Sequence, residues 1–377
     1  MGLGDDSTLA RLTPAGPGLY GRSHADSGGR SGGVRACRRP PPRRPPRRRW
    51  LRTGRHAPGP DARLVAVLMA APLAPVRGAG AAGAVPTWYA HRLNRAAVYR
   101  AVALLAAMLP RAARLAAAGA VADLVARWLP AERAAVERAI ARFVPAAPAG
   151  ERAALVAATF RSFARCFADL IAANRGRGLG WLCAGVAGLE RLHAAATDGR
   201  GVVVLTAHVG NWELAGRLLA LQLSRPTHVV VAAEADPGVE RFLRRAPAPV
   251  RFVVRRDATS ALPLVGALRR GAVVAMQGDR ALGTRGDVAQ PFFGAPAAFP
   301  VGPFVLARAA GVAVVPAFCV STTDDRYAIE VGEPIDVAPG AEAAAQRRWV
   351  AALERVVAAH PTQWFNFFDV WSPAPAP

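Results

Sequence analysis

The chain has 377 residues, of which 52% are hydrophobic and 20% charged, and its formal net charge is +22. This length is enough for one large domain or two small ones with a buried core. Every Lys or Arg position holds arginine, which excludes enzymes that work through a lysine Schiff base and nucleotide-binding proteins that need a P-loop lysine.

Residues 1–86 are expected to lie outside the fold. From Arg35 to Arg55 the chain is rich in Arg and Pro and shows neither a helical nor a strand period. Such a run is typical of a disordered tail, or of sequence translated upstream of a true start at Met69. The alternative is an arm that binds nucleic acid or anionic lipid. We expect the tail, and no nucleic-acid partner.

Residues 87–195 are predicted to form a helical, membrane-associated N-terminal part. Ala, Leu and Arg dominate this segment. The stretch 99–121 within it is apolar, but Arg111 and Arg114 near its middle disfavour a bilayer span. A helix lying in the headgroup region fits this composition better. A core helix of a soluble domain is the alternative.

Residues 196–372 are predicted to form an α/β core that makes one domain with the preceding helices. Short Val-rich runs alternate with segments of helical period. The expected strands are 201–207, 227–233, 250–255, 271–277, 311–320 and 327–332, and the expected helices are 212–223, 237–246, 260–270 and 301–310. Near-continuous Val runs indicate strands buried on both faces. The fold class is therefore α/β, with a mixed, mostly parallel sheet flanked by helices.

The four cysteines, Cys37, Cys166, Cys183 and Cys319, lie far apart, without a CxxC pair or a histidine at metal-ligand spacing. This pattern is typical of small buried side chains in a reducing compartment. We expect no metal site.

The stretch LTAHVGNWELAG, residues 205–216, holds the main catalytic candidates. His208 follows an expected central strand, at the carboxyl edge where open α/β sheets bind their ligands. Gly210 eases the turn, and Asn211 can cap the next helix. Residues five apart inside one helix point about 140° apart. His208 must therefore precede the helix, with Glu213 in its first turn, if the two are to meet.

In that arrangement Glu213 would hold one imidazole nitrogen of His208, and the other nitrogen could take a proton from an alcohol. The alternative is a hydrogen-bonded histidine beside a solvated glutamate.

A second candidate site is the stretch GDRALGTRG, residues 278–286. Its glycines let the backbone approach an anion that Arg280 and Arg285 can also reach. We expect Arg280, with Arg285, Asp279 and Asn211, to contribute to substrate binding. A solvated loop with a structural Asp279–Arg280 pair is the alternative.

Four stretches, in this order, resemble the bacterial lipid A biosynthesis late acyltransferases, the lauroyl and myristoyl transferases. They are HVGNWE from His208, GDR from Gly278, PFFGAPAAFPVGP from Pro291 and HPTQWFNFFDVW from His360. The first motif is weakly specific by itself, and the four together are fairly specific. The resemblance covers residues 90–371.

The resemblance implies a membrane-associated O-acyltransferase at the cytoplasmic face of the inner membrane, working without a cofactor. A fatty acyl chain would pass from acyl carrier protein, or from acyl-CoA, to a hydroxyl of a lipid A precursor or related glycolipid. His208 would act as the base and Glu213 as its partner. The alternatives are an acyltransferase for an amino-acid lipid or a phosphatidylinositol mannoside, an acyl-ester hydrolase, or a non-catalytic basic protein that binds membranes.

Overall fold

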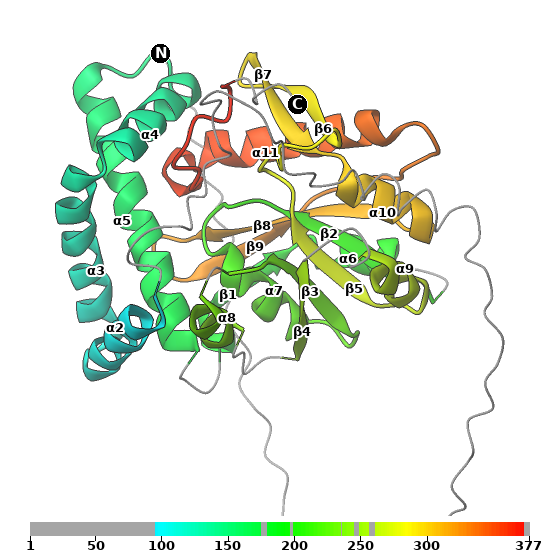
Figure 1. Cartoon of the computed structure of the whole chain (residues 1–377), viewed down its shortest axis with the longest axis horizontal. Helices are drawn as coiled ribbons and strands as arrows, with labels where there is room; N and C mark the ends of the chain where they lie inside the picture. Colours follow the sequence, from blue (N-terminus) through cyan, green and yellow to red (C-terminus); the bar gives the residue numbers. More distant parts are fainter. Residues whose placement is uncertain are drawn as a thin grey trace, which may run out of the picture. The chain divides into compact units, whose positions relative to one another are not determined.

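The structure is a computed structural model that describes residues 95–174, 179–196, 199–234, 236–244, 249–255 and 261–372 (Figure 1). All of these residues belong to one structural unit, His56–Pro377. The expected tail, residues 1–86, lies outside the described residues, as does Cys37.

A seven-stranded sheet forms the centre of the described fold, in the order β1-β9-β8-β2-β5-β3-β4. The strands are β1 (Cys183–Ala187), β2 (Val202–Thr206), β3 (Thr227–Ala232), β4 (Val250–Arg255), β5 (Val273–Gln277), β8 (Val314–Ser321) and β9 (Tyr327–Val331). All neighbours run parallel except β8 and β9. The α/β fold class with a mostly parallel sheet is confirmed, and each strand expected from the sequence is present.

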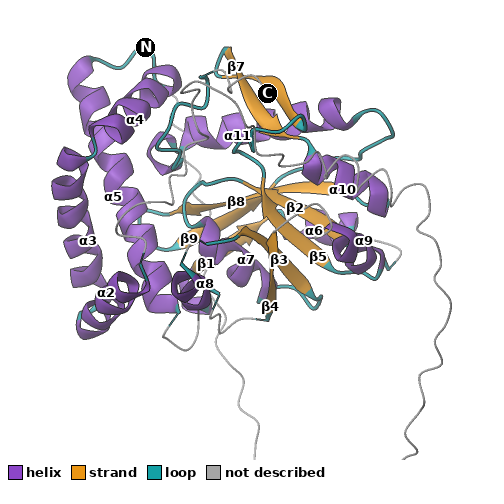
Figure 2. Cartoon of the chain, in the orientation of Figure 1, coloured by secondary structure: helices purple, strands orange, loops and turns teal. Residues whose placement is uncertain are grey.

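Helices cover both faces of this sheet (Figure 2). They are α6 (Leu189–Ala195), α7 (Trp212–Ala220) and α8 (Pro237–Leu243) on one face, and α9 (Leu262–Arg269), α10 (Gly302–Ala310) and α11 (Glu342–Ala359) on the other. Successive side chains of β2 alternate between the two layers: Val202 and Val204 pack with the first set, Val203 and Leu205 with the second. Every residue of β2 is buried, which explains the uninterrupted apolar run.

Four further helices lie together beside the sheet, at the left of Figure 1. They are α2 (Ala96–Met108), α3 (Arg111–Val125), α4 (Pro130–Phe143) and α5 (Ala149–Ala173), with the 3-10 turn η1 (Ala126–Trp128) between α3 and α4. The long helix α5 joins both layers of the core, because Phe160 packs in one layer and Leu170 in the other.

The apolar stretch 99–121 is divided between α2 and α3 at Pro110, and its two arginines have a structural role. Arg111 and Arg114 form ion pairs with Asp169 of α5, at 2.6 and 3.3 Å. The Tyr327 hydroxyl donates to the same carboxylate at 2.9 Å. A buried carboxylate needs such compensation. None of the helices in the described ranges is long and apolar enough to cross a membrane.

Strand β1, a hairpin after β5 and helix α11 were not expected from the sequence. The segment 87–195 was expected to be helical, but it contains β1, which pairs with β9. The stretch after Asp287 forms a separate hairpin of β6 (Asp287–Phe292) and β7 (Ala295–Pro300). Strand β1 and the hairpin both depend on pairing that is not visible in a local hydrophobic period.

Replacing Trp349 by alanine should strongly destabilise the fold. Its side chain is fully buried, packs against Phe299 and Phe318, and donates from Nε1 to the carbonyl oxygen of Leu205 in β2 at 3.0 Å. We expect Trp349→Ala to lower the free energy of unfolding by about 3–5 kcal/mol in urea titrations followed by circular dichroism. Trp128→Ala is the matched control, because that side chain is 72% exposed. Equal losses of unfolding free energy in the two variants would contradict the structural role of Trp349.

Candidate active site

The turn that follows β2 presents His208 at the carboxyl edge of the sheet. Gly210 has φ 53°, and a Cβ at this position would lie 2.0 Å from the carbonyl oxygen of Cys319. The turn therefore requires glycine. Asn211 caps α7 as expected, since its side chain accepts from the Leu214 amide. Its other amide atom donates to the carbonyl oxygen of Cys166 at 3.1 Å. Asn211 is buried, and these contacts use both ends of the amide.

Backbone hydrogen bonds hold this turn from two sides. The Asn211 amide donates to the carbonyl oxygen of Cys319 in β8 at 3.0 Å. On the other side, the Gly210 amide donates to the carbonyl oxygen of Gln363 at 2.7 Å, and the Phe365 amide donates to the carbonyl oxygen of His208 at 2.8 Å. The position of the imidazole is therefore determined by β2, β8 and the segment after α11.

Asp279 is the carboxylate that binds the imidazole. Its Oδ1 lies 2.7 Å from Nδ1 of His208. Its Oδ2 accepts from the His208 amide, from Nε1 of Trp364 and from Nδ2 of Asn366, each at 3.0 Å. Asp279 comes shortly after β5, which lies directly beside β2 in parallel register. Because the carboxyl ends of neighbouring parallel strands meet at one edge, residues 71 positions apart become partners.

Glu213 makes a different contact from the one predicted. It lies in the first turn of α7, as expected, and its Oε2 is 3.6 Å from Nη1 of Arg244. Arg244 also pairs with Glu234, at 3.6 Å. The negative charge of Glu213 still acts on His208 and raises the pKa of the imidazole. The structure thus assigns the Nδ1 contact to Asp279 and leaves Glu213 as a nearby charge held by Arg244.

Arg280 and Arg285, the two predicted anion-binding arginines, are separated. Arg280 donates from Nε to Oδ1 of Asn366 at 2.7 Å and from Nη2 to the carbonyl oxygen of Phe365 at 3.0 Å. It therefore fixes the segment that holds Asp279. Arg285 is exposed in the loop before β6. A substrate-binding role for either residue stays a prediction.

Burial, together with the charge of Arg280, favours a neutral imidazole at His208. Burial lowers its pKa below 6.5 and the Arg280 charge lowers it further, whereas Asp279 and Glu213 oppose these effects. Burial would raise the pKa of Asp279, but His208 and Arg280 hold it well below its usual value. Burial lowers the pKa of Arg280 to about 10, so this guanidinium stays charged at neutral pH. The site thus contains an ionised carboxylate, a cation and an uncharged imidazole.

Two residues that organise this site were not predicted as functional. Neither Trp364 nor Asn366 was among the predicted site residues, yet both donate to Asp279. The available signal was a polar asparagine inside an otherwise aromatic run, which indicates a buried polar contact.

A histidine oriented by a buried carboxylate at a sheet edge is the arrangement of enzymes that remove a proton from a bound substrate. The chain belongs to the bacterial lipid A biosynthesis acyltransferase family, which it matches over residues 90–372. The family description and the names of the curated relatives are those of acyltransferases.

Curated relatives are similar over part of their length. A phosphatidylinositol mannoside acyltransferase of Mycobacterium tuberculosis (strain ATCC 25618 / H37Rv) is 30% identical over 197 residues, which are 49% of this chain and 59% of that protein. The protein of the same name from Mycolicibacterium smegmatis is 29% identical over 58% of this chain and 72% of its own length. The chain thus spans well under two thirds of the M. tuberculosis protein.

Among solved structures, the 1-acyl-sn-glycerophosphate acyltransferase of Thermotoga maritima is similar at 18% identity. The TM-score is 0.32, and the match covers 55% of this chain and 89% of that one.

The imidazole of His208 should titrate below pH 6.5. Since burial and Arg280 both disfavour its protonated form, the neutral form persists to a lower pH than in a free histidine. Asp279→Asn should lower the pKa further, because it removes a charge that raises it. Proton NMR of the histidine C2 resonances would measure both values, with His208→Gln to assign the signal. A pKa at or above 6.5 in the unmodified protein would contradict this electrostatic picture.

Proposed function

We propose that this enzyme moves a fatty acyl chain from an acyl thioester to a hydroxyl group of a membrane glycolipid. The observation that carries the proposal is the 2.7 Å contact between Nδ1 of His208 and the buried Asp279 carboxylate. An ionised carboxylate only accepts hydrogen bonds, so Nδ1 carries the proton and Nε2 is the basic nitrogen.

The reaction follows from that tautomer. Nε2 of His208 takes the proton of the acceptor hydroxyl as its oxygen attacks the thioester carbonyl carbon. The carbon–sulfur bond then breaks, and the departing thiolate takes the proton back from the imidazolium. The charges of Asp279 and Glu213 both stabilise the imidazolium while it exists. An ester forms, a thiol leaves, and the histidine returns to its neutral state.

Direct transfer is favoured over an acyl-enzyme. Cys166 and Cys319 are both buried, and burial raises the pKa of each thiol. Protonated thiols are poor nucleophiles. The acceptor hydroxyl is therefore the nucleophile in our proposal.

The acceptor is a glycolipid with a free sugar hydroxyl. The family description favours a lipid A precursor, whereas the curated relatives are named for phosphatidylinositol mannoside. The two acceptors share a sugar alcohol next to acyl chains, which is the group that His208 would deprotonate. Both belong in the assay.

The donor is expected to be acyl carrier protein. Arginines also outnumber acidic side chains in the part of the chain after residue 86, and this surplus favours association with an acidic partner. Acyl-CoA is the second donor to test.

We further propose that the enzyme works at the cytoplasmic face of the inner membrane. Leu104, Leu105 and Met108 of α2 are 58%, 64% and 80% exposed. Large apolar side chains gathered on one surface helix are typical of a face that enters the headgroup region of a bilayer.

Substitutions at the site separate the roles of its two carboxylates. His208→Ala should lower kcat about 10²–10⁴-fold through loss of the base. Asp279→Asn should approach the same loss, roughly 10³–10⁴-fold, because the amide no longer fixes the imidazole. Glu213→Gln should cost less than Asp279→Asn, since its charge acts without holding Nδ1. Thiol release with either donor measures the rates. A larger loss of kcat in Glu213→Gln than in Asp279→Asn would show that Glu213 is the partner of His208, as expected from the sequence.

Product analysis tests the proposed reaction itself. With a lipid A precursor or a phosphatidylinositol mannoside and either thioester, mass spectrometry should detect an acylated glycolipid that disappears in His208→Ala. Free fatty acid formed at the same rate without any acceptor would show a hydrolase and overturn the proposal. Wild-type transfer by His208→Ala would overturn the mechanism.

A further inference from the structure

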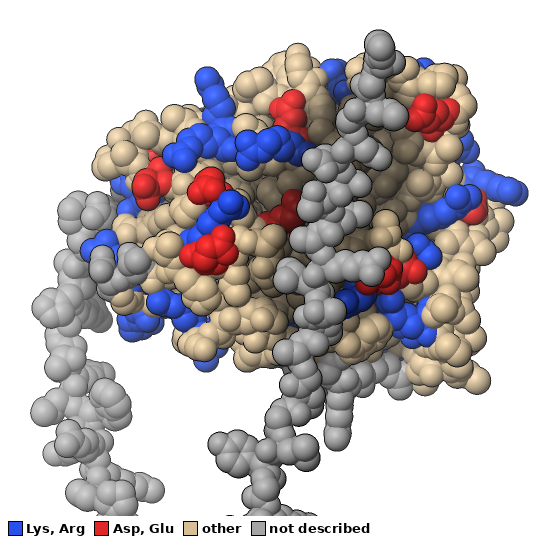
Figure 3. All heavy atoms as spheres, turned by 180° about the vertical axis from the view of Figure 1, so that it is seen from behind, with Lys and Arg blue, Asp and Glu red and all other residues tan. Residues whose placement is uncertain are grey.

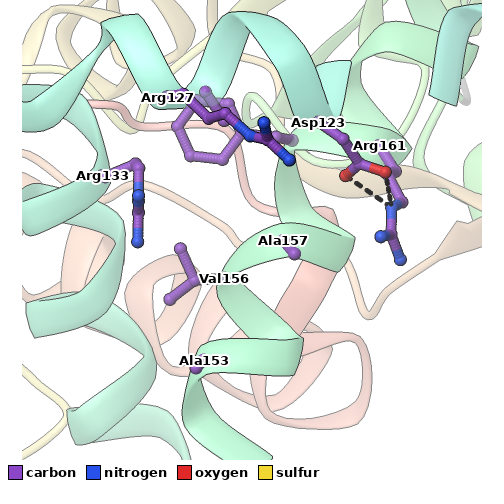
Figure 4. A pocket seen from close by; sticks show the side chains of 9 residues that line it. Asp123, Arg127, Arg133, Ala153, Val156, Ala157 and Arg161 are labelled. Atoms are coloured by element: carbon purple, nitrogen blue, oxygen red, sulfur yellow. Dashed lines mark hydrogen bonds and ion pairs between the residues drawn. The ribbon is translucent and has the colours of Figure 1, made fainter. Parts of the chain in front are cut away.

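A pocket separate from the His208 site lies between α3, η1, α4 and α5 (Figure 4). Its volume is about 310 Å³, at the lower end of the range for small-molecule sites. Ala126, Val156, Ala157 and Phe160 supply apolar lining, and Arg127, Arg133 and Arg161 supply charge. The size fits a polar head group and excludes a whole lipid.

The charge in this pocket is strongly positive. Asp123 is the only acidic side chain among the described residues that line it, and both of its oxygens accept from Nε of Arg161, at 2.7 and 2.9 Å. Within the described residues, no carboxylate forms an ion pair with Arg127 or Arg133. Figure 4 shows Arg127 between Arg133 and the Asp123–Arg161 pair. Among the residues that the structure describes, two guanidinium groups thus stand beside one concave surface without an ion-paired carboxylate.

The excess of positive charge is particular to this pocket. On the face shown in Figure 3, arginine and acidic side chains are intermixed. The acidic residues of α4 and α5, namely Glu132, Glu137, Glu151 and Asp169, do not line the pocket. A general surplus of arginine therefore does not account for it.

Exposed apolar side chains stand next to the arginines. Val121 and Leu124 of α3 and Trp128 of η1 are 58%, 48% and 72% exposed. They alternate in sequence with the pocket residues Asp123 and Arg127. Tryptophan beside arginine is the composition of a segment at a membrane interface, where the ring lies at headgroup depth and the guanidinium reaches phosphate.

We propose that this pocket binds the phosphate of an anionic membrane phospholipid while the adjacent apolar side chains enter the bilayer. Guanidinium groups match phosphate oxygens in charge and geometry. The apolar surface beside them favours a lipid over a soluble anion. The inference rests on the proposed function only for the membrane setting, and it concerns a site other than the one around His208.

The pocket also adjoins the segment that builds the catalytic site. Phe160, in its lining, packs against Phe367 with ring centroids 5.1 Å apart. The neighbouring residue Asn366 donates to Asp279. A bound phospholipid would therefore place the bilayer close to the segment that orients His208.

Vesicle sedimentation with the full chain tests the proposal. The protein should bind phosphatidylcholine vesicles more tightly when they contain phosphatidylglycerol. Arg127→Gln/Arg133→Gln should weaken binding to the anionic vesicles roughly 10-fold or more at low salt and leave binding to pure phosphatidylcholine unchanged. The matched control is Arg251→Gln/Arg355→Gln, which removes the same charge at exposed positions on β4 and α11 outside the pocket. It should bind like the unmodified protein.

A second variant shifts binding in the opposite direction. Asp123→Asn removes the only acidic residue of the lining and releases Arg161, so it should strengthen binding to anionic vesicles. Thermal unfolding checks that each variant is folded.

Equal losses in the pocket and control variants, or equal binding to both vesicle types by the unmodified protein, would overturn the proposal. So would a pocket variant that loses affinity for acyl carrier protein and keeps it for vesicles. Because vesicle binding is measured without acyl transfer, a failure of the proposed reaction would leave this result standing.

Discussion

The burial of one ionised carboxylate constrains the whole active site. Asp279 is 1% exposed, and an ionised group in such a place is stable only when its oxygens are fully hydrogen-bonded and a cation is near. Four donors meet it, from the backbone and ring of His208 and from Trp364 and Asn366. Arg280 supplies the positive charge. The hydrogen bonds to Asp279 therefore hold together the imidazole, the end of β5 and the segment after α11.

A second buried carboxylate, in the N-terminal helices, is compensated in the same way. Asp169 is buried in α5, and Arg111, Arg114 and Tyr327 compensate it. Arginines inside an apolar stretch were interpreted from the sequence as evidence against a bilayer span. In the structure they bind a carboxylate that lies more than fifty positions later in the chain. The two arginines in this apolar stretch are therefore explained by their tertiary contact with Asp169.

The sequence was sufficient where local chemistry decides the structure. Val runs predicted β2, β5 and β8 because nearly every residue of these three strands is buried. Gly210 and Asn211 predicted the turn at His208 because positive φ and helix capping are local properties. The partner of the imidazole could not be found in this way. Glu213 is near in sequence, whereas Asp279 comes into contact only because β5 lies beside β2, and spacing alone leaves strand order open. Helix α11 was not predicted, although the apolar spacing of Trp349, Val350, Leu353 and Val357 indicates it.

On one side, the hydrogen bonds that hold the His208 turn are made with Gln363 and Phe365, which follow α11. Every strand of the seven-stranded sheet, including β2, which His208 follows, precedes these residues in the chain. During synthesis the sheet can therefore assemble while the imidazole still lacks its outer supports. The enzyme can orient its base only after the aromatic segment that contains Phe365 has been synthesised and has packed against the His208 turn. A prematurely terminated copy would keep the sheet-forming sequence yet be unable to orient its base.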